Sequence, residues 1–228
     1  MPLLPIVDRV RQPESVGLPT RQLRDQKDVN CCFSCALAAA MEAGDASMPP
    51  LAPLFHFVFA GGQSSVIEGL TPAQARSALL QKGMCALERH PFEISKPNVA
   101  RQPDAQAVED GRKRRPIDRS SGTLLWKPAP TNWKRYLGKG LPIVIGIQPN
   151  ADYMSLNAQR PVLKTITGVD MRAGHAVAVI GYRDSDSCYV VQDSRGPSFG
   201  LQGQWFLPYA LATSPFVVLA FVLAAESV

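Results

Sequence analysis

The sequence has too few cysteines, and too uneven a spacing of them, to predict a disulfide-bonded framework. It contains five, and three of them fall between positions 31 and 35. An odd and crowded set is a poor match for the paired cysteines of small secreted domains. Free thiols are typical of proteins in a reducing compartment, so the sequence predicts a cytoplasmic protein.

The sequence also lacks a recognisable signal peptide and a membrane-spanning segment. Residues 1–9 contain no basic region followed by an apolar one. The long apolar stretch near the end is interrupted by Pro208 and Pro215, and the part that remains, 216–223, is short and rich in β-forming residues. We expect a buried strand there and no membrane partner. Secretion without a signal peptide would leave no mark in these features.

Charge of one sign is not concentrated anywhere, so a nucleic-acid partner is not predicted. The formal net charge is +5, and the basic residues are scattered along the chain. The densest basic run, Arg112–Arg115, lies in a polar stretch that is more typical of a solvated loop than of a binding patch.

Apolar sequence, by contrast, is plentiful enough for a packed core. Apolar residues make up 46% of the 228 positions, which suffices for one large domain or for two lobes around a cleft. The first part of the chain favours helices and the second favours strands, as in an α+β fold with segregated halves. We expect a single domain with a mainly helical lobe over about residues 13–125 and a mainly β lobe over about residues 126–228.

Local signals predict the main elements of both lobes. Helices are expected at 32–43 with a stop at Gly44, from the Thr71-Pro72 start signal to Gly83, and at 133–137. Apolar and β-branched runs predict strands at 142–147, 175–180, 188–192 and 216–223. Residues 96–122 are charged and poor in large apolar side chains, so they are expected to form an exposed insertion.

Four residues form a candidate set for nucleophilic catalysis. Cys32 stands where the first helix is expected to begin, and Gln26 precedes it by six residues. His175 opens a predicted strand, and Asp193 follows the next strand, just before a glycine-rich turn. Because the first pair belongs to the helical half and the second to the strand half, their site is expected at the junction of the lobes, where active sites are common.

Each residue type suits one part of thiol chemistry. A free thiol is mostly protonated at neutral pH, but a helix N-terminus and a neighbouring imidazole such as His175 both favour the thiolate. Asp193 can hold that imidazole in the required tautomer. The side-chain amide of Gln26 and the backbone N–H of Cys32 can donate to a developing oxyanion.

Taken one at a time, these residues have structural interpretations. Cys32 could be a buried thiol, His175 a hydrogen-bonded core histidine and Asp193 the start of a turn. Their order along the chain is what favours catalysis: an amide, a thiol that opens a helix, a histidine that opens an apolar strand, and a carboxylate before a glycine-rich turn.

This order resembles that of the papain-like cysteine peptidases, especially their bacterial members. Cys32 and the aromatic Phe33 match the family's nucleophile and the residue after it. His175 with the following Ala and Val resembles the "HAV" motif, and the run that starts at Asp193 resembles "NSWGxxWG". Residues 203–209 resemble the closing strand, and the match extends from about residue 13 to 223.

The resemblance implies a fold and a function. The fold would have a helical N-terminal lobe, an antiparallel β-barrel-like C-terminal lobe and an active site between them. The function would be that of an endopeptidase that hydrolyses peptide bonds with Cys32, His175 and Asp193 as a triad and Gln26 at the oxyanion. Gly69 matches a substrate-binding glycine. No cofactor or metal is implied; the partners would be a peptide or protein substrate and, for control, a protein inhibitor or regulator.

Several positions depart from the family pattern. Asp193 stands where the family mostly has Asn, although either can orient an imidazole and a carboxylate stabilises imidazolium more strongly. Arg195 replaces the Trp that usually shields this contact, so the pair is expected to be wetter or to involve Arg195. Lys27 replaces the Gly that usually follows the oxyanion amide, and Val29 replaces a disulfide cysteine.

Other classes remain open at this stage. The spacing of Gln26 and Cys32 also resembles double-glycine leader peptidases, and acyl transferases or deamidases use the same Cys–His machinery. Cys32 and Cys35 could form a thioredoxin-like redox pair, and clustered cysteines with a histidine could bind zinc. The unusual Arg195 and Lys27 also admit a catalytically silent binding module on the same scaffold.

Overall fold

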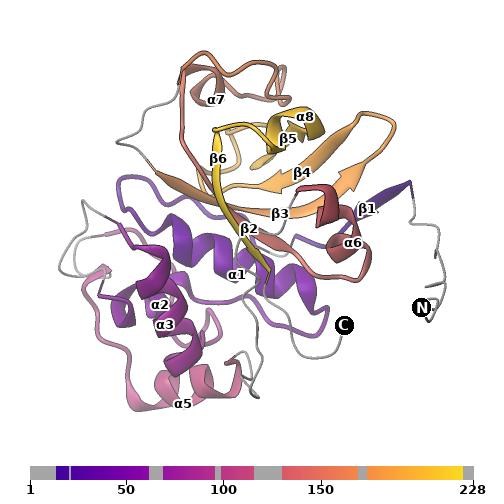
Figure 1. The fold of residues 1–228 in the computed structure, drawn as a ribbon. Helices are drawn as coiled ribbons and strands as arrows, with labels where there is room; N and C mark the ends of the chain where they lie inside the picture. The colour runs from indigo at the N-terminus through magenta and orange to yellow at the C-terminus, as the bar shows by residue number, and fades with distance from the viewer. Residues whose placement is uncertain are drawn as a thin grey trace, which may run out of the picture.

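Helices form one half of the structure and an antiparallel sheet the other. The computed structural model describes residues 14–20, 22–61, 69–95, 99–115, 130–168 and 174–222. The helical half contains α1 (Cys32–Gly44), α2 (Pro53–Phe59), α3 (Pro72–Lys82) and α5 (Ala105–Lys113). Figure 1 shows α1 next to the sheet, with the other three helices on its far side. The expected α+β fold with two lobes is confirmed.

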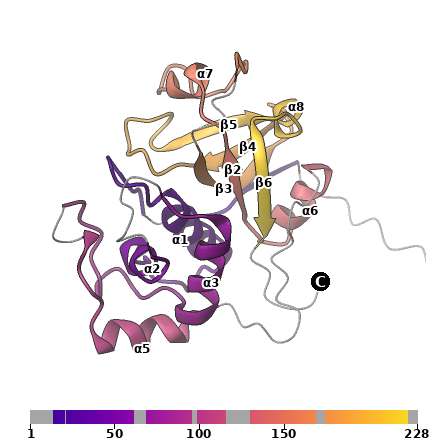
Figure 2. The same ribbon diagram turned by 60° about the vertical axis from the view of Figure 1, so that its left-hand side comes forward.

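The sheet has six strands, of which β3 is the longest. The strands are β1 (Ser15–Gly17), β2 (Ile143–Ile147), β3 (His175–Arg183), β4 (Cys188–Gln192), β5 (Gln204–Pro208) and β6 (Val217–Val222). Their order is β5-β4-β3-β2-β6, with β1 added to β3, and the strand pairings are antiparallel. The turn η2 (Pro130–Asn132) and the short helices α6 (Trp133–Gly138), α7 (Ala151–Met154) and α8 (Tyr209–Ala212) lie beyond the sheet from α2 and α3 (Figures 1 and 2).

Both faces of the sheet are apolar, because successive side chains of a strand point to opposite faces. Ala176 and Ala178 of β3 belong to the core that the sheet shares with α1. Val177 and Val179 belong to a second core, which contains the buried Trp133. Burial on both faces explains why these strands are continuous apolar runs rather than alternating ones.

Helix α1 is central because it is buried along most of its length. Its alanines let it pack closely against β3 on one side and α2 on the other. Glu42 is also buried; its carboxylate pairs with Arg24 and accepts a hydrogen bond from the backbone N–H of Leu51 at 2.6 Å. This pair ties the chain before α1 and the chain before α2 to one helix.

The predicted helices and strands are confirmed apart from small shifts at their ends. The side chain of Thr71 caps α3 by accepting from the backbone N–H of Gln74 at 3.3 Å, and the side chain of Gln74 accepts from Thr71 N–H at 2.9 Å. Gly83 ends α3 with a φ of 68°, a conformation that glycine adopts without strain. The sequence did not predict strand β1, helices α2, α5, α7 and α8, or the turn η2.

Most of the described residues in the expected insertion over 96–122 are exposed, but one face of α5 is not. Helix α5 is packed against the helical lobe, with Ala107 and Gly111 buried. A Cβ at Gly111 would lie 2.6 Å from the Phe55 ring, so small residues are what allow this close packing. Asp110 accepts from the backbone N–H of Ala86 at 2.8 Å. Residues 96–98 and 116–122 lie outside the described residues.

The basic run Arg112–Arg115 is not the predicted loop. It covers the last turn and the C-terminal end of α5, where positive charge interacts favourably with the helix dipole. Arg114 pairs with Asp110 at 2.5 Å, one turn earlier. Among the described residues, no helix is long and apolar enough to cross a membrane.

Candidate active site

The Cys32 thiol lies at the N-terminal end of α1, as expected. Cys31 is the N-cap residue, but no side chain caps the helix and its first turn contains no acidic residue. The partial positive charge of the helix end is therefore not neutralised by a carboxylate of its own first turn. The backbone N–H of Cys32 is one of the first-turn groups that have no partner within a helix.

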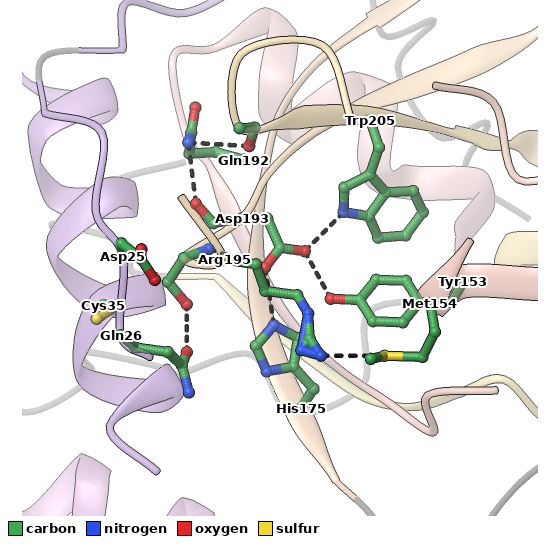
Figure 3. Close-up of polar contacts among 12 residues, drawn as sticks. Asp25, Gln26, Cys35, Tyr153, Met154, His175, Gln192, Asp193, Arg195 and Trp205 are labelled. Atoms are coloured by element: carbon green, nitrogen blue, oxygen red, sulfur yellow. Dashed lines mark hydrogen bonds and ion pairs between the residues drawn. The ribbon is translucent and has the colours of Figure 1, made fainter. Parts of the chain in front are cut away.

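His175 lies across the lobe junction from Cys32, at the first residue of β3. Pairing with Ile147 of β2 fixes its backbone, and its side chain is buried. One ring nitrogen, Nε2, donates to Asp193 Oδ1 at 2.9 Å, as Figure 3 shows. Cys32 and the imidazole line the same cleft, and the interaction between them lowers the pKa of the thiol and raises that of the imidazole. The structure thus brings together the three residues of the predicted triad.

Asp193 accepts four hydrogen bonds and its side chain is fully buried. Oδ1 accepts from His175 Nε2 at 2.9 Å and from the backbone N–H of Ser194 at 2.8 Å. Oδ2 accepts from the Tyr153 hydroxyl at 2.8 Å and from the Trp205 indole N–H at 2.9 Å (Figure 3). The carboxylate is therefore fixed in position by donors from three parts of the β lobe and by its own neighbour.

The electrostatics of the three groups favour a thiolate beside an imidazolium. Burial raises the pKa of the Cys32 thiol, but the hydrogen bond and charge of His175 outweigh it and lower that pKa below its ordinary value. Burial lowers the pKa of His175, but the charge and hydrogen bond of Asp193, helped by Cys32, raise it to about 10. Burial raises the pKa of Asp193, but His175, Tyr153 and Trp205 together lower it.

Gln26 is held next to this set by pairing between two distant segments. The backbone N–H of Gln26 donates to Ser194 O at 2.8 Å, and Gly196 N–H donates to Arg24 O at 3.0 Å. The Gln26 side chain accepts from the Ser194 hydroxyl at 2.5 Å and donates to Val29 O at 3.0 Å. These two side-chain bonds fix the orientation of the amide, because a flip that exchanged its nitrogen and oxygen would break both of them.

A cleft of about 460 Å³ runs along the site between the lobes. Gln26, Cys32 and His175 all line it, and so does Gly69. Gly69 has a φ of 72°, and a Cβ there would lie 3.2 Å from Asn30 O. The position therefore favours glycine, which leaves backbone exposed to an occupant of the cleft.

Arg195 does not pair with Asp193, and the His175–Asp193 pair is not open to water. The Arg195 guanidinium instead lies over the rings of Tyr153 and Phe199, 5.7 and 5.5 Å from their centroids. Its Nη2 also contacts Met154 Sδ at 3.0 Å. The expectation of a wetter or Arg195-paired dyad is therefore wrong, because aromatic rings and Asp193's own donors occupy the surroundings.

Sequence reasoning missed three residues that contact the predicted set. Tyr153 and Trp205 bind Asp193, and Ser194 binds Gln26. Tyr153 comes from the short helix α7 and is distant in sequence from every other member, so no local pattern points to it. Ser194 and Trp205 lie in segments that resemble family motifs, but the residue pattern of those segments does not indicate which groups the two side chains contact.

Cys31 and Cys35 lie beside Cys32 but face each other. Their sulfur atoms are 3.8 Å apart, and all five cysteines are free thiols. The hydrogen bond with Cys35, together with burial, raises the pKa of Cys31 well above its ordinary value. Cys32 is thus distinguished from its neighbours by its contact with His175. Within the described ranges, no group of three or more His, Cys, Asp or Glu side chains is arranged to hold a metal ion.

Several solved structures with a similar fold are cysteine proteases. Xylellain, a cysteine protease from Xylella fastidiosa, matches with a TM-score of 0.76 and 19% identity, over 94% of this chain and 87% of its own. A cysteine protease from Carica candamarcensis in complex with E-64 matches with a TM-score of 0.69 and 15% identity, over 94% and 100%. Bromelain from Ananas comosus, also in complex with E-64, gives 0.67 and 16% over the same shares.

Comparison of sequences alone finds much less similarity to known proteins. No protein-family model matches the chain. An uncharacterized peptidase C1-like protein of Acanthamoeba polyphaga mimivirus is 31% identical over 78 residues, which is 33% of this chain and 25% of the viral protein. The structural matches, in contrast, extend over nearly the whole chain. They show that this protein has the papain-like fold, with α1 and β3 meeting at the junction of its two lobes.

Proposed function

We propose that this chain is a cysteine peptidase that hydrolyses peptide bonds through a thioacyl intermediate. The observation that carries the proposal is the continuous contact from Cys32 through His175 to Asp193, at a cleft lined by both lobes. The cysteine proteases among its structural relatives support the same reaction class.

The first half of the reaction transfers the acyl group to the enzyme. The Cys32 thiolate attacks the carbonyl carbon of the peptide bond and forms a C–S bond. The carbonyl oxygen becomes an oxyanion, which accepts from the Cys32 backbone N–H and the Gln26 amide. His175 gives its proton to the leaving nitrogen as the C–N bond breaks, so an amine departs and a thioester remains.

The second half returns the enzyme to its starting state. Neutral His175 takes a proton from a water molecule, whose oxygen attacks the thioester carbon. The same two donors stabilise the second oxyanion, and the C–S bond breaks to release a carboxylic acid, which gives up its remaining proton to water. Asp193 keeps the imidazole oriented through both halves. The N-terminal end of α1 favours the thiolate that leaves.

The substrates that fit this proposal are peptides or extended protein segments. Gly69 supports this class because it leaves room for a substrate backbone at the cleft wall. A cytoplasmic location is consistent with five free thiols, four of which have no part in the proposed chemistry.

A peptide-library digest tests the proposal. Wild type is expected to generate new peptide termini, detected by mass spectrometry, whereas Cys32→Ala and Cys32→Ser proteins are expected to produce essentially none. Retained cleavage in Cys32→Ala would contradict the assignment of the nucleophile.

The digest also separates the alternatives. A leader peptidase would cut only after a paired-glycine sequence, a deamidase would convert side-chain amides without new backbone termini, and an acyl transferase would join the acyl group to an added amine. A silent binding module would show none of these changes. Ser is similar in size to Cys, so a loss of cleavage in Cys32→Ser cannot be attributed to a cavity left by a missing side chain. This variant is therefore the matched control for Cys32→Ala.

A further inference from the structure

The carboxylate of Asp193 sits among donors that an amide could not satisfy. Each of its oxygens accepts two hydrogen bonds, one pair from His175 and Ser194 and the other from Tyr153 and Trp205. An Asn side chain has one acceptor oxygen and one NH₂ group. With its oxygen toward His175, its NH₂ group would face the Trp205 indole, which can only donate.

We infer that Tyr153 and Trp205 are positioning residues for the proposed peptidase, which hold Asp193 as an ionised, fully accepting carboxylate and make position 193 specific for Asp. Tyr153 reaches Oδ2 from α7 and Trp205 reaches it from β5. Neither contacts the thiol through a hydrogen bond, so they act through Asp193. The inference rests on the proposed function only in treating Cys32 and His175 as the working pair.

The contacts of Tyr153 indicate that it orients Asp193 and does not only fill space in the core. Its ring lies 5.9 Å from the imidazole of His175 and 5.6 Å from the ring of Trp205. Its hydroxyl is turned to Asp193, a contact that helps burial to raise the pKa of Tyr153 well above its ordinary value. The phenol therefore keeps its proton, and can donate it to Asp193, at neutral pH.

Titratable and charged groups approach Asp193 from several elements and loops. They include His175 from β3, Cys32 from α1, Tyr153 from α7 and the guanidinium of Arg195 beyond the Tyr153 ring. Arg24 and Cys35 line a small cavity together with Asp193. Removing a donor to Oδ2 makes the carboxylate easier to protonate. Since a protonated Asp193 no longer stabilises imidazolium, the thiolate is then lost at a higher pH.

The test measures the rate of Cys32 alkylation by iodoacetamide against pH, read for each cysteine by mass spectrometry. In Tyr153→Phe and in Trp205→Phe, the acid limb of the profile is expected to move upward by about one pH unit, and further in the double variant. Acid limbs that coincide with that of wild type would overturn the inference. Tyr189→Phe removes a buried hydroxyl that donates to Pro130 O instead, and it should leave the profile unchanged.

Rescue provides a second readout that a purely structural role would not produce. Asp193→Asn is expected to lower the alkylation rate near neutral pH by about tenfold or more. Adding Trp205→Phe removes the donor that faces the new NH₂ group, so it is expected to restore part of that rate. An Asp193→Asn protein as reactive as wild type, or a double variant no faster than Asp193→Asn, would contradict specificity for Asp.

These readouts do not depend on peptide cleavage. If the acid limbs move as expected but no peptide is cut, the proposed function fails and the positioning role remains. If wild type cleaves peptides but the limbs coincide, the positioning role fails and the proposed function remains.

Discussion

Two of the three buried histidines of this protein, His175 and His56, differ in the partners of their ring nitrogens. His175 lies at the lobe junction between a carboxylate and a thiol. His56 lies inside the helical lobe, where its Nε2–H donates to Ala75 O and its Nδ1 accepts from the Ser34 hydroxyl, each at 2.8 Å. The first joins the two lobes, and the second ties α1, α2 and α3 together.

The two imidazoles titrate in opposite directions although both are buried. Burial lowers the pKa of His56 to about 4, because the Ala75 carbonyl only partly offsets it. For His175, the charge of Asp193 outweighs burial and raises the pKa to about 10. Burial alone therefore does not make an imidazole suitable for catalysis; an ionised partner on one nitrogen and a nucleophile on the other do.

The largest expected effect is on turnover. His175→Ala should lower peptide turnover by about 10⁴-fold or more, because the proton acceptor and donor of the proposed reaction is lost. His56→Ala should leave turnover per folded molecule nearly unchanged. Initial rates on a peptide found in the library digest measure both. Similar losses of turnover in the two variants would contradict the assignment of the proton-transfer role to His175 alone.

A smaller loss of turnover is expected when the oxyanion donor is removed without changing either histidine. Gln26→Ala should lower kcat by about 10²- to 10³-fold. The pH profile of Cys32 alkylation should stay as in wild type, since the imidazole keeps its partners. Gln22→Ala changes a nearby amide whose contact is with Leu23 O, and is the matched control. A shifted alkylation profile in Gln26→Ala would show that Gln26 acts on the thiolate instead.

His56 and His175 should contribute to the free energy of unfolding with opposite dependence on pH. His56 binds a proton more readily unfolded, at its ordinary pKa of 6.5, than folded, at about 4. Its contribution is complete above about pH 6.5 and is lost as pH falls toward 4, by up to about 3 kcal/mol. His175 has the opposite sign: its raised pKa adds stability below pH 6.5 that is lost as pH rises toward 10.

Urea unfolding at several pH values measures these slopes. The free energy of unfolding of His56→Ala should depend less on pH between 4 and 6.5 than that of wild type, and His175→Ala should depend less on pH above 6.5. If the free energy of unfolding of each variant depends on pH as that of wild type does in both ranges, the protonation states assigned to His56 and His175 are contradicted.

The smallest effect is expected at the hydroxyl that binds His56. Ser34→Ala leaves Nδ1 of a buried ring without its donor and should cost about 1 kcal/mol of stability. Alkylation of Cys32, two residues earlier on α1, should remain as in wild type. Ser47→Ala, on an exposed turn, should change stability by less. Thermal unfolding followed by circular dichroism gives both values, and a slower alkylation of Cys32 in Ser34→Ala would mean that the two histidine environments are coupled.

The parts of the site that the sequence predicted are those with strong local signals. Cys32 follows a run without helix signals and opens an alanine-rich helix, and His175 opens an apolar strand. These signals also predicted helices α1, α3 and α6 and most of the strands. The order of the motifs, not any single residue, indicated that the two would meet.

The parts that the sequence did not predict depend on packing between distant segments. Tyr153 reaches Asp193 because α7 folds over the second core, and nothing in its own segment indicates that contact. The sequence of residues 105–113 indicates only an exposed segment, because the two residues that α5 buries, Ala107 and Gly111, are small. Arg195 looks like a charge available to Asp193, yet the rings of Tyr153 and Phe199 hold it elsewhere.

The most direct test of the central claim is the alkylation of all five cysteines by iodoacetamide at several pH values, in wild type and His175→Ala. If Cys32 is a thiolate paired with His175, it will be labelled at neutral and mildly acidic pH far faster than the other four, and the substitution will remove that advantage. Equal labelling of the five cysteines, or a Cys32 rate that is the same in His175→Ala, would contradict the account.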